Sequence, residues 1–221
     1  MPMSIPTNLQ QVKSTLPENV TLVAVSKTKP VSDLMQAYEA GQRIFGENKI
    51  QEMVEKWEQM PKDIQWHMIG HVQTNKVKFM APFVSLIHGV DSLKLLQEIN
   101  KQAQKNNRII DCLLQIHIAD EETKFGFDEE ELEILLNSIE FQEMKNIRIL
   151  GLMGMATFTD NQEKVKQEFT HLKAIFDSIQ MQSVPTLNFS TLSMGMSGDY
   201  KLAIECGSNM IRVGSSIFGS R

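Results

Sequence analysis

The feature that most constrains the fold is a regular alternation of short apolar segments with longer amphipathic segments along the 221 residues. Each apolar segment has the length and the Val, Ile and Leu content of a strand, and helix-like sequence follows it. The predicted strands are centred near Val23, Ile44, His67, Leu86, Leu114, Ile149, Leu187 and Ile211. Eight strand–helix units in one chain of this length favour a closed (β/α)8 barrel over an open doubly wound sheet.

Within the strand predicted over residues 64–70, side chains should alternate between two faces. His67 and Ile69 then lie on one side, and Trp66 and Met68 lie on the other. The almost continuous apolar run IIDCLLQIHIA, residues 109–119, fits a strand that is covered on both faces.

Three further predictions concern the end of the seventh strand, the N-terminal segment and the number of domains. The seventh strand is expected to end at Ser190, so that residues 190–199 form a loop. A short polar helix precedes the first strand. No linker, internal repeat or low-complexity tract divides the chain, so we predict one α/β domain over residues 1–221, a single TIM-type (β/α)8 barrel with an extra N-terminal helix.

Charge and composition exclude several classes of partner. The net charge is −5 and no dense run of Lys or Arg occurs, whereas nucleic-acid binding usually requires a basic face. No segment approaches the roughly 18 apolar residues of a membrane-spanning helix, and the N-terminus lacks the pattern of a signal peptide. We expect a cytoplasmic protein without nucleic-acid or membrane partners. Cys112 and Cys206 lack CxxC spacing and predict buried thiols rather than a disulfide or zinc ligands.

Polar and small residues gather where the predicted strands end. In a barrel of this type, reactive groups lie at the C-terminal ends of strands and in the loops that follow. The residues at these positions are Lys27, Glu47, Asn48, His67, His71, Lys124, Gly126, Met153, Met155, 190–193 and 212–216. We expect them to converge on one rim, with the two methionines as apolar walls of a pocket or of the barrel core.

The segment IRVGSSIFGS, residues 211–220, predicts an anion site. Gly214 and the serines after it separate the last strand from a helix-like segment, where backbone N–H groups are exposed. Phosphate sites of barrels commonly involve strands seven and eight, and residues 190–199 add hydroxyls and glycines. Alternatively, the glycines serve only as turn residues. By its position at a strand end, Lys27 is either a solvated cap or a nucleophile in a partly dry pocket, and the stretch alone does not decide. A phosphate opposite it leads to the hypothesis of pyridoxal 5'-phosphate, held covalently by the lysine and non-covalently by the last two loops.

Other chemistries have weaker support in the sequence. The five histidines form no HExxH motif and no pair with metal-ligand spacing beside a carboxylate, so we predict no metal site. His67 and His71 are interpreted as polar groups at a strand end. GxSxG and GxGxxG motifs are absent, which argues against a serine hydrolase of that type and against a Rossmann cofactor site.

Several stretches, taken together and in order, resemble the motifs of the pyridoxal phosphate homeostasis proteins. These are single barrels related in fold to the N-terminal domain of alanine racemase. The stretches are AVSKTKP, FGEN with QE shortly after, WHMIGHVQTNK, KFGF, GLMGM, LSMGMSGD and RVGSSIFGSR. The resemblance covers residues 20–221.

The resemblance implies a role for each predicted site residue. Lys27 is the residue implied to form an imine with pyridoxal 5'-phosphate, and Asn48 is implied to lie near the ring oxygen of the cofactor. Arg212 is implied to lie near the pyridine nitrogen. The implied phosphate cradle comprises Ser193, Gly214 and Ser215.

Catalysis would require a second acid or base opposite the lysine. Arginine stays protonated, so Arg212 beside the ring nitrogen disfavours a pyridinium ion and weakens the cofactor as an electron sink. Alanine racemase adds a catalytic tyrosine from a second domain. Here Tyr38 is expected on the outer helical layer, Tyr200 lies beside the loop after strand seven, and Lys124 is the best remaining candidate. We predict no catalytic residue.

The predicted function is therefore binding of pyridoxal 5'-phosphate for its carriage and homeostasis, with no or very weak catalysis. We expect a monomer that contacts cofactor-free pyridoxal phosphate enzymes transiently. The rival prediction is a pyridoxal phosphate-dependent amino-acid racemase, which shares the cofactor and differs in turnover. A third is a sugar-phosphate barrel enzyme, which would keep the phosphate loop and leave Lys27 without its imine.

Overall fold

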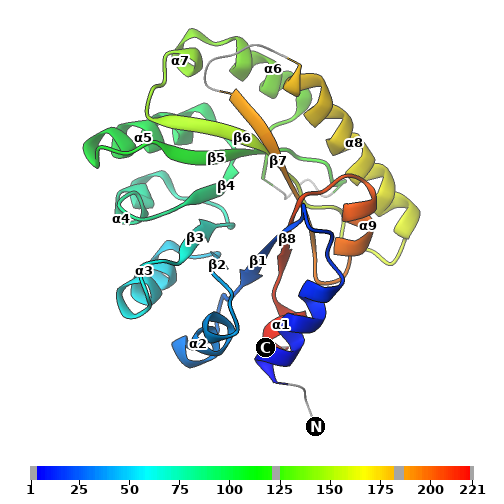
Figure 1. The fold of residues 1–221 in the computed structure, drawn as a ribbon. Helices are drawn as coiled ribbons and strands as arrows, with labels where there is room; N and C mark the ends of the chain where they lie inside the picture. Colours follow the sequence, from blue (N-terminus) through cyan, green and yellow to red (C-terminus); the bar gives the residue numbers. More distant parts are fainter. Residues whose placement is uncertain (1–3, 121–124, 182–186, 220–221) are drawn as a thin grey trace.

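The computed structural model describes residues 4–120, 125–181 and 187–219, and its strands close into a barrel (Figure 1). The strands are β1 (Thr21–Val25), β2 (Ile44–Glu47), β3 (Gln65–Met68), β4 (Leu86–Val90), β5 (Ile110–Gln115), β6 (Ile147–Met153), β7 (Leu187–Met196) and β8 (Met210–Val213). Each strand pairs in parallel with the next, and β8 returns to β1 with Thr21 opposite Met210 and Ala24 opposite Val213. The predicted (β/α)8 barrel is confirmed.

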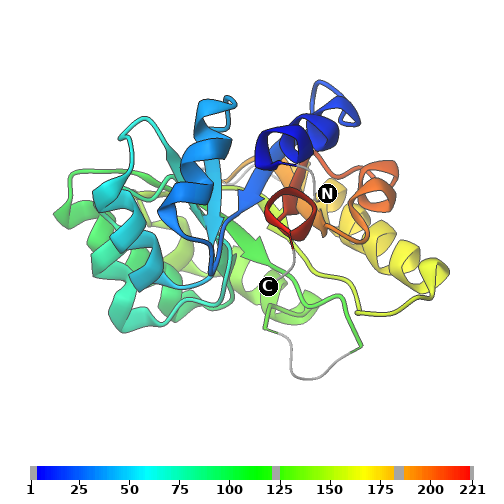
Figure 2. The same cartoon turned by 90° about the horizontal axis from the view of Figure 1, so that it is seen from below.

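Helices surround the barrel and connect its strands (Figures 1 and 2). They are α1 (Ile5–Ser14), α2 (Val31–Glu39), α3 (Ile50–Gln59), the 3-10 helix η1 (Thr74–Lys76), α4 (Val77–Met80), α5 (Leu93–Lys105), α6 (Glu129–Asn137), α7 (Ile139–Gln142), α8 (Gln162–Gln180), α9 (Tyr200–Glu205) and α10 (Ser215–Phe218). The extra N-terminal helix α1 packs against α10 and α2. The Asn8 side chain donates a hydrogen bond to the Ile217 carbonyl at 3.1 Å. Because α10 is short, α1 completes the outer layer beside β8.

The strands separate two apolar cores. The smaller core fills the barrel interior and consists of Val23, Leu86, Leu113, Met153 and Met210. The larger core lies between the strands and the helices. Trp66 and Met68 of β3 belong to the outer core, while Ile69, the residue directly after β3, packs against the inner one. The predicted alternation is therefore confirmed, and it explains how neighbouring residues can serve different layers.

Strand β7 is longer than the sequence predicts. It extends to Met196, so the prediction that it ends at Ser190 is wrong. Leu192 and Met194 are buried in the outer core, and Ser193 between them is fully buried on the opposite face. Pairing with β6 and β8 keeps this segment extended in spite of its small and polar residues. Ser193 consequently belongs to a strand and not to a loop.

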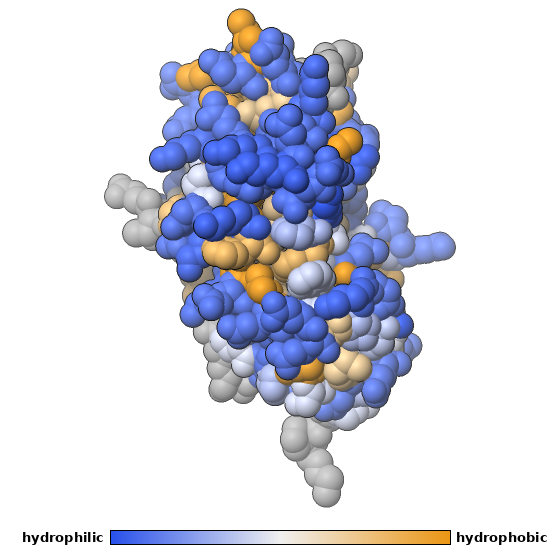
Figure 3. All heavy atoms as spheres, turned by 90° about the vertical axis from the view of Figure 1, so that its left-hand side faces the viewer, coloured by the Kyte–Doolittle hydropathy of each residue, from blue (hydrophilic) through white to orange (hydrophobic). Residues whose placement is uncertain are grey.

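The surface over helices α3 to α5 is mainly hydrophilic, with a strip of apolar residues across its middle (Figure 3). No helix within the described residues is both long and apolar enough to cross a bilayer. Both cysteines are free thiols; Cys112 is buried as predicted, whereas Cys206 is only partly buried. The described residues contain no cluster of His, Cys, Asp and Glu side chains that could hold a metal ion.

Candidate functional site

A cavity of about 540 Å³ lies at the C-terminal ends of the strands. The predicted site residues that line it are Lys27, Asn48, Arg212, Gly214 and Ser215. Further polar lining comes from Lys29, Thr157, Thr159, Asp160, Ser197 and Asp199, and apolar lining includes Ile69 and Met155. The structure thus brings together residues from both ends of the chain at the rim where polar side chains are predicted to converge.

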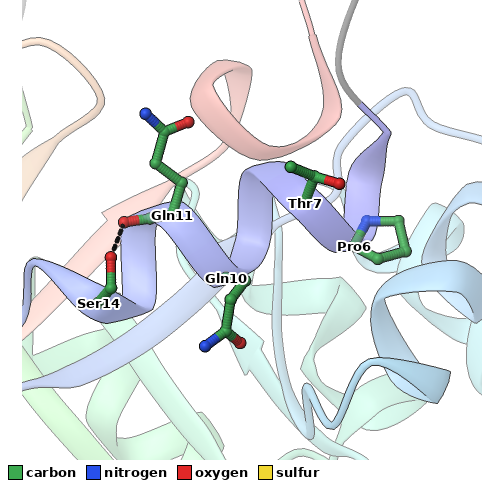
Figure 4. Close-up of a pocket in the computed structure, with 5 residues that line it drawn as sticks. All are labelled: Pro6, Thr7, Gln10, Gln11 and Ser14. Carbon is green, nitrogen blue, oxygen red and sulfur yellow. Dashed lines mark hydrogen bonds between the residues drawn. The ribbon is translucent and has the colours of Figure 1, made fainter.

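A second hollow lies on the exposed side of α1 (Figure 4). Its lining residues, Pro6, Thr7, Gln10, Gln11 and Ser14, all come from this one helix and carry no charge. Uncharged side chains on a single helix do not converge on a ligand as the strand-end residues do. The candidate site is therefore the cavity at the barrel rim.

Lys27 lies in a tight turn that follows β1. The Lys29 amide donates to the Ser26 carbonyl at 3.1 Å, and Thr28 between them has a positive φ of 66°. Side chains alternate along the chain, so Val25 and Lys27 face the cavity while Ser26 points into the outer layer. The Lys29 ammonium group donates to the Phe218 carbonyl at 3.0 Å and ties this turn to α10.

Asn48 follows β2 and reaches the cavity from its neighbouring wall. The loop after β3 passes close to it, because a Cβ atom on Gly70 would lie 2.5 Å from the Asn48 carbonyl oxygen. Only glycine permits this approach of the two backbones. The preceding residue, Glu47, faces the outer layer and is fully buried. Burial raises the pKa of the Glu47 carboxyl, against the opposing effect of the Lys56 ammonium group.

Arg212 is the buried end of a hydrogen-bonded chain that crosses the barrel interior. Its guanidinium group donates to the Ser193 hydroxyl at 2.7 Å and to the Ser193 and Gly154 carbonyls at 2.8 and 3.0 Å. The Ser193 hydroxyl lies 3.0 Å from Nδ1 of His88, whose Nε2 lies 3.0 Å from Nδ1 of His67. Ser193 therefore contacts Arg212 and does not line the cavity.

The charge along this chain resides on the arginine. Burial lowers the pKa of Arg212 to about 10, against the opposing effect of Asp199, so the guanidinium group stays cationic at neutral pH. Burial lowers the pKa of His67 to about 3. Burial also lowers the pKa of His88, helped by the nearby His67 and Arg212. Both imidazoles are neutral at pH 7 and can relay a hydrogen bond without adding charge.

Small residues that follow β7 and β8 form another wall of the cavity. The Gly214 amide donates to the Ser197 hydroxyl at 3.2 Å, and both residues line the cavity with Ser215. A Cβ atom on Gly214 would lie 3.0 Å from the Val25 carbonyl oxygen and 3.2 Å from the Val25 Cβ, so a side chain there would press on β1. Ser197 was not predicted individually as a site residue, although it lies in the quoted stretch LSMGMSGD.

The remaining sequence candidates lie elsewhere. The Tyr38 hydroxyl donates to Asp63 on the outer layer, as expected for that helix. The Tyr200 hydroxyl lies 3.3 Å from the Thr15 hydroxyl beside α1, so among the described residues no tyrosine lines the cavity. Lys124 falls outside the described residues. The role of His88 as the centre of a buried chain was also missed, because no local motif marks it.

The donor set of the cavity fits a phosphorylated aromatic aldehyde. A primary amine, an arginine, serine hydroxyls and the backbone at Gly214 surround a space with apolar walls at Ile69 and Met155. An aldehyde reacts with an amine, a phosphate accepts hydrogen bonds from N–H and hydroxyl groups, and an aromatic ring packs against apolar side chains. The tight approach of Gly214 to β1 leaves the backbone itself as the cavity wall.

Comparison with known proteins agrees with this chemistry. The family model of the alanine racemase N-terminal domain matches residues 3–221. The pyridoxal phosphate homeostasis protein of Haemophilus influenzae is 40% identical over 205 residues, which are 91% of this chain and 85% of the relative. The protein of the same name from Synechocystis is 39% identical, and the match covers 99% of this chain and 100% of the relative.

Comparison with solved structures places the chain in the same family and fold. PipY of Synechococcus elongatus, solved with PLP bound, has a TM-score of 0.89 and 33% identity, covering 98% of this chain and all of PipY. Alanine racemase from E. faecalis has a TM-score of 0.74 at 19% identity, so it shows the fold alone, and the match covers 58% of its length. The chain is therefore a member of the family of pyridoxal phosphate homeostasis proteins, whose barrel is that of the alanine racemase N-terminal domain.

Proposed function

We propose that this protein binds pyridoxal 5'-phosphate in the rim cavity and serves its carriage and homeostasis, with residues 1–221 acting as one cofactor-binding domain. The observation that carries the proposal is the convergence of Lys27, Arg212 and the Gly214–Ser215 segment on one cavity. Relatives covering nearly the whole chain are named for pyridoxal phosphate homeostasis, and PipY was solved with PLP bound. These findings support the same ligand here.

In this proposal each end of the cofactor meets a different set of groups. The Lys27 amine condenses with the aldehyde, forming a C=N bond and releasing one water molecule. The phosphate lies against the Gly214 and Ser215 backbone and the hydroxyl of Ser197. Asn48 approaches the ring oxygen and Arg212 the ring nitrogen. All of these residues line the cavity.

Ser193 receives a different role from the one that the family resemblance implies. It is fully buried and bonded to Arg212 and His88. We therefore assign it to the support of Arg212, and we assign the hydroxyl contact with phosphate to Ser197. The two serines lie four positions apart on β7 and the turn that follows it, so their roles are separable by substitution.

The arrangement favours holding the cofactor over using it. When bound, pyridoxal 5'-phosphate supplies an electron sink, which is strongest when its ring nitrogen is protonated. Arg212 cannot accept a proton and, as a cation, disfavours protonation of its neighbour. Among the described lining residues no tyrosine faces Lys27 as a second acid or base. We propose no catalytic residue and no or very weak catalysis.

The rival function, amino-acid racemisation, shares the ligand and is separated by turnover. We expect purified, cofactor-loaded protein to leave the chirality of D- and L-amino acids unchanged in chiral chromatography. Racemisation on the order of 1 per second or faster would place it among ordinary enzymes and overturn the carrier function. A colourless protein that binds a sugar phosphate instead would support the third alternative.

Carriage also requires release. We propose that the protein acts as a monomer in the cytoplasm and gives its cofactor to cofactor-free enzymes in transient contacts. Mixing loaded protein carrying labelled cofactor with an excess of such an enzyme should activate the enzyme and remove label from the carrier. A dialysed control measures spontaneous release. Label that stays on Lys27 for hours beside an inactive acceptor would contradict direct donation.

A further inference from the structure

An ionic cluster, buried at Glu47 and Lys56 and partly exposed at Glu52, lies directly behind the cavity wall, where helix α3 meets the ends of strands β1 and β2. The Lys56 ammonium group donates to Glu47 at 2.7 Å, to Glu52 at 2.8 Å and to the Ser26 carbonyl at 2.8 Å. The Ser26 hydroxyl donates to the same Glu47 oxygen at 2.6 Å. Lys56 is 5% exposed and Glu47 is not exposed at all. The lysine thus links α3 to the ends of two strands.

Strand alternation connects this cluster to the cavity. Ser26 and Glu47 point outward into the cluster, and the next residues, Lys27 and Asn48, line the cavity on the other side of the wall. Holding the outward residue fixes the backbone that carries its inward neighbour. The Ser26 carbonyl accepts from both the Lys56 ammonium group and the Lys29 amide, so it anchors the first residue of the turn.

The turn itself has a conformation that its sequence disfavours. Thr28 has a φ of 66°, in the left-handed region, which is a genuine outlier for a β-branched residue. Such conformations persist only when their surroundings hold them in place. Here the Thr28 amide donates to Glu52 at 2.5 Å, the same carboxylate oxygen that accepts from Lys56. The cluster therefore holds the strained residue directly after Lys27.

Stability alone does not account for this arrangement. Burying an ion pair is expensive, and replacing one with apolar side chains is often neutral or stabilising. Among the residues that the structure describes, one Glu47 oxygen is buried without a hydrogen-bond partner, which adds a further penalty. The ionic groups therefore add little stability over apolar side chains in the same places. They contact the lysine turn at the Ser26 carbonyl and the Thr28 amide, so they are suited to fixing its conformation.

We propose that Glu52, Lys56 and Glu47 are positioning residues that hold the Lys27–Thr28 turn in its left-handed form and so aim the Lys27 amine into the cavity. The reaction of Lys27 rests on the proposed function, whereas the state of the turn does not. A cofactor-free protein can therefore be tested for the turn, and a loaded protein for its consequence. The claim that the cluster holds the turn and the claim that Lys27 reacts with the cofactor can therefore fail independently.

The first measurement follows amide hydrogen exchange in the cofactor-free protein. In Glu52→Ala the Thr28 amide loses its acceptor, and we expect exchange at Thr28 and Lys29 to become faster by about tenfold or more, with slower-exchanging amides of the strands unchanged. Glu52→Gln keeps an acceptor oxygen and should preserve most of the protection. Protection equal to that of the unaltered protein in Glu52→Ala would overturn the proposal.

The second measurement follows borohydride-trapped label at Lys27 after brief exposure to pyridoxal 5'-phosphate. We expect Glu52→Ala to slow labelling by about fivefold to tenfold, because a less ordered turn must be fixed when the cofactor binds. In a Thr28→Gly background the left-handed form needs no support, so the same substitution should have less than half of that effect. Equal effects in both backgrounds would overturn the proposal.

Arg148→Met is the matched control. It breaks the two hydrogen bonds from Arg148 to Asp111, at 2.7 and 2.9 Å, at the far ends of β5 and β6. It should leave both readouts unchanged. If the unaltered protein acquires no label at Lys27, the proposed function fails, while the exchange data still decide whether the cluster holds the turn. Should Glu52→Ala fail to fold, Glu52→Leu, which also removes the acceptor of the Thr28 amide but keeps the side-chain volume, takes its place in both backgrounds.

Discussion

The two ends of the cavity are supported by opposite kinds of chemistry. Behind Lys27, the support is ionic: a buried lysine between two glutamates in the outer layer. Behind Arg212, the support is a chain of neutral groups in the barrel interior, where two uncharged imidazoles and a serine hydroxyl lead to one guanidinium group. The difference follows from what each end must hold. A turn with a disfavoured backbone conformation needs strong contacts, whereas a strand residue such as Arg212 already has a fixed backbone.

The ionic support should give the largest loss of stability when it is broken. Lys56→Met keeps the aliphatic stem but leaves Glu47 and Glu52 without their cation, and we expect a loss of about 3–5 kcal/mol in chemical denaturation. Arg148→Met, which removes a more exposed pair, should lose less than about 1 kcal/mol.

The loss in Lys56→Met should depend on pH. Burial raises the pKa of Glu47, so the folded state favours its protonated form. The contribution of this group is therefore present at low pH and is lost as the pH rises through the folded-state pKa. Without Lys56 the carboxylate is still less favourable, and the difference between the two proteins should widen as the pH rises above the ordinary carboxyl pKa of 4.5. A loss under about 1 kcal/mol at every pH would show that the cluster is not an ionic support.

The phosphate wall should respond next most strongly. In Gly214→Val the new side chain meets the Val25 backbone and fills the space beside it, so we expect affinity for pyridoxal 5'-phosphate to fall by roughly a hundredfold. Ser197→Ala removes one hydrogen bond to a charged group and should weaken binding by about tenfold, with a smaller effect from Ser215→Ala, which keeps its backbone amide. Equilibrium dialysis measures all three.

The hollow on α1 provides a control for these measurements. Thr7→Ala lies in that hollow and should leave affinity unchanged. If Gly214→Val and Ser197→Ala also bind with unaltered affinity, the phosphate lies elsewhere.

The neutral hydrogen-bonded chain behind Arg212 should make the stability of the protein depend on pH below neutrality. Burial depresses the pKa of His67 from 6.5 to about 3, so its contribution to stability is present above pH 6.5 and is lost as the pH falls toward 3. This group alone should reduce stability by roughly 1.5 kcal/mol between pH 6.5 and pH 5. His67→Gln should flatten the pH dependence by that amount, whatever its stability at pH 7. An identical slope in denaturation curves would mean that the buried imidazole does not control acid sensitivity.

The smallest effect is expected at Ser193. Ser193→Ala removes one of the three acceptors that Arg212 has within the described part of the chain, and it removes the link to His88. The Ser193 and Gly154 carbonyls continue to hold the guanidinium group. Cofactor affinity should fall by less than about fivefold, less than in Ser197→Ala. The reverse order in dialysis would return Ser193 to the phosphate site that the family resemblance implies.

Sequence patterns predicted the barrel because each strand carries its own apolar run, and that signal is local. They also predicted Lys27, Asn48, Arg212, Gly214 and Ser215 as neighbours, since strand ends in such a barrel meet at one rim. Ser193 was misplaced because small polar residues resemble a loop, and only pairing with β6 and β8 keeps them in a strand.

The supports behind the cavity could not be predicted in this way. Glu52 and Lys56 have the spacing of an ordinary exposed helical pair, and the burial of Lys56 depends on how α3 packs against β2 and β3. His67 and His88 lie 21 positions apart and meet only across the barrel interior. Long-range packing decides both cases, and no local motif encodes it.

The most direct test is to locate the covalent attachment. Loaded protein is reduced with borohydride and digested, and the peptide that carries the pyridoxyl group is identified by mass spectrometry, in parallel with Lys27→Ala and Lys29→Ala. Lys29 is the matched control, because it lines the same cavity two residues away. We predict label on Lys27, its loss in Lys27→Ala with some cofactor still retained by the phosphate contacts, and its persistence in Lys29→Ala. Label on Lys29 or on any other lysine, or undiminished label in Lys27→Ala, would contradict the assignment of this cavity.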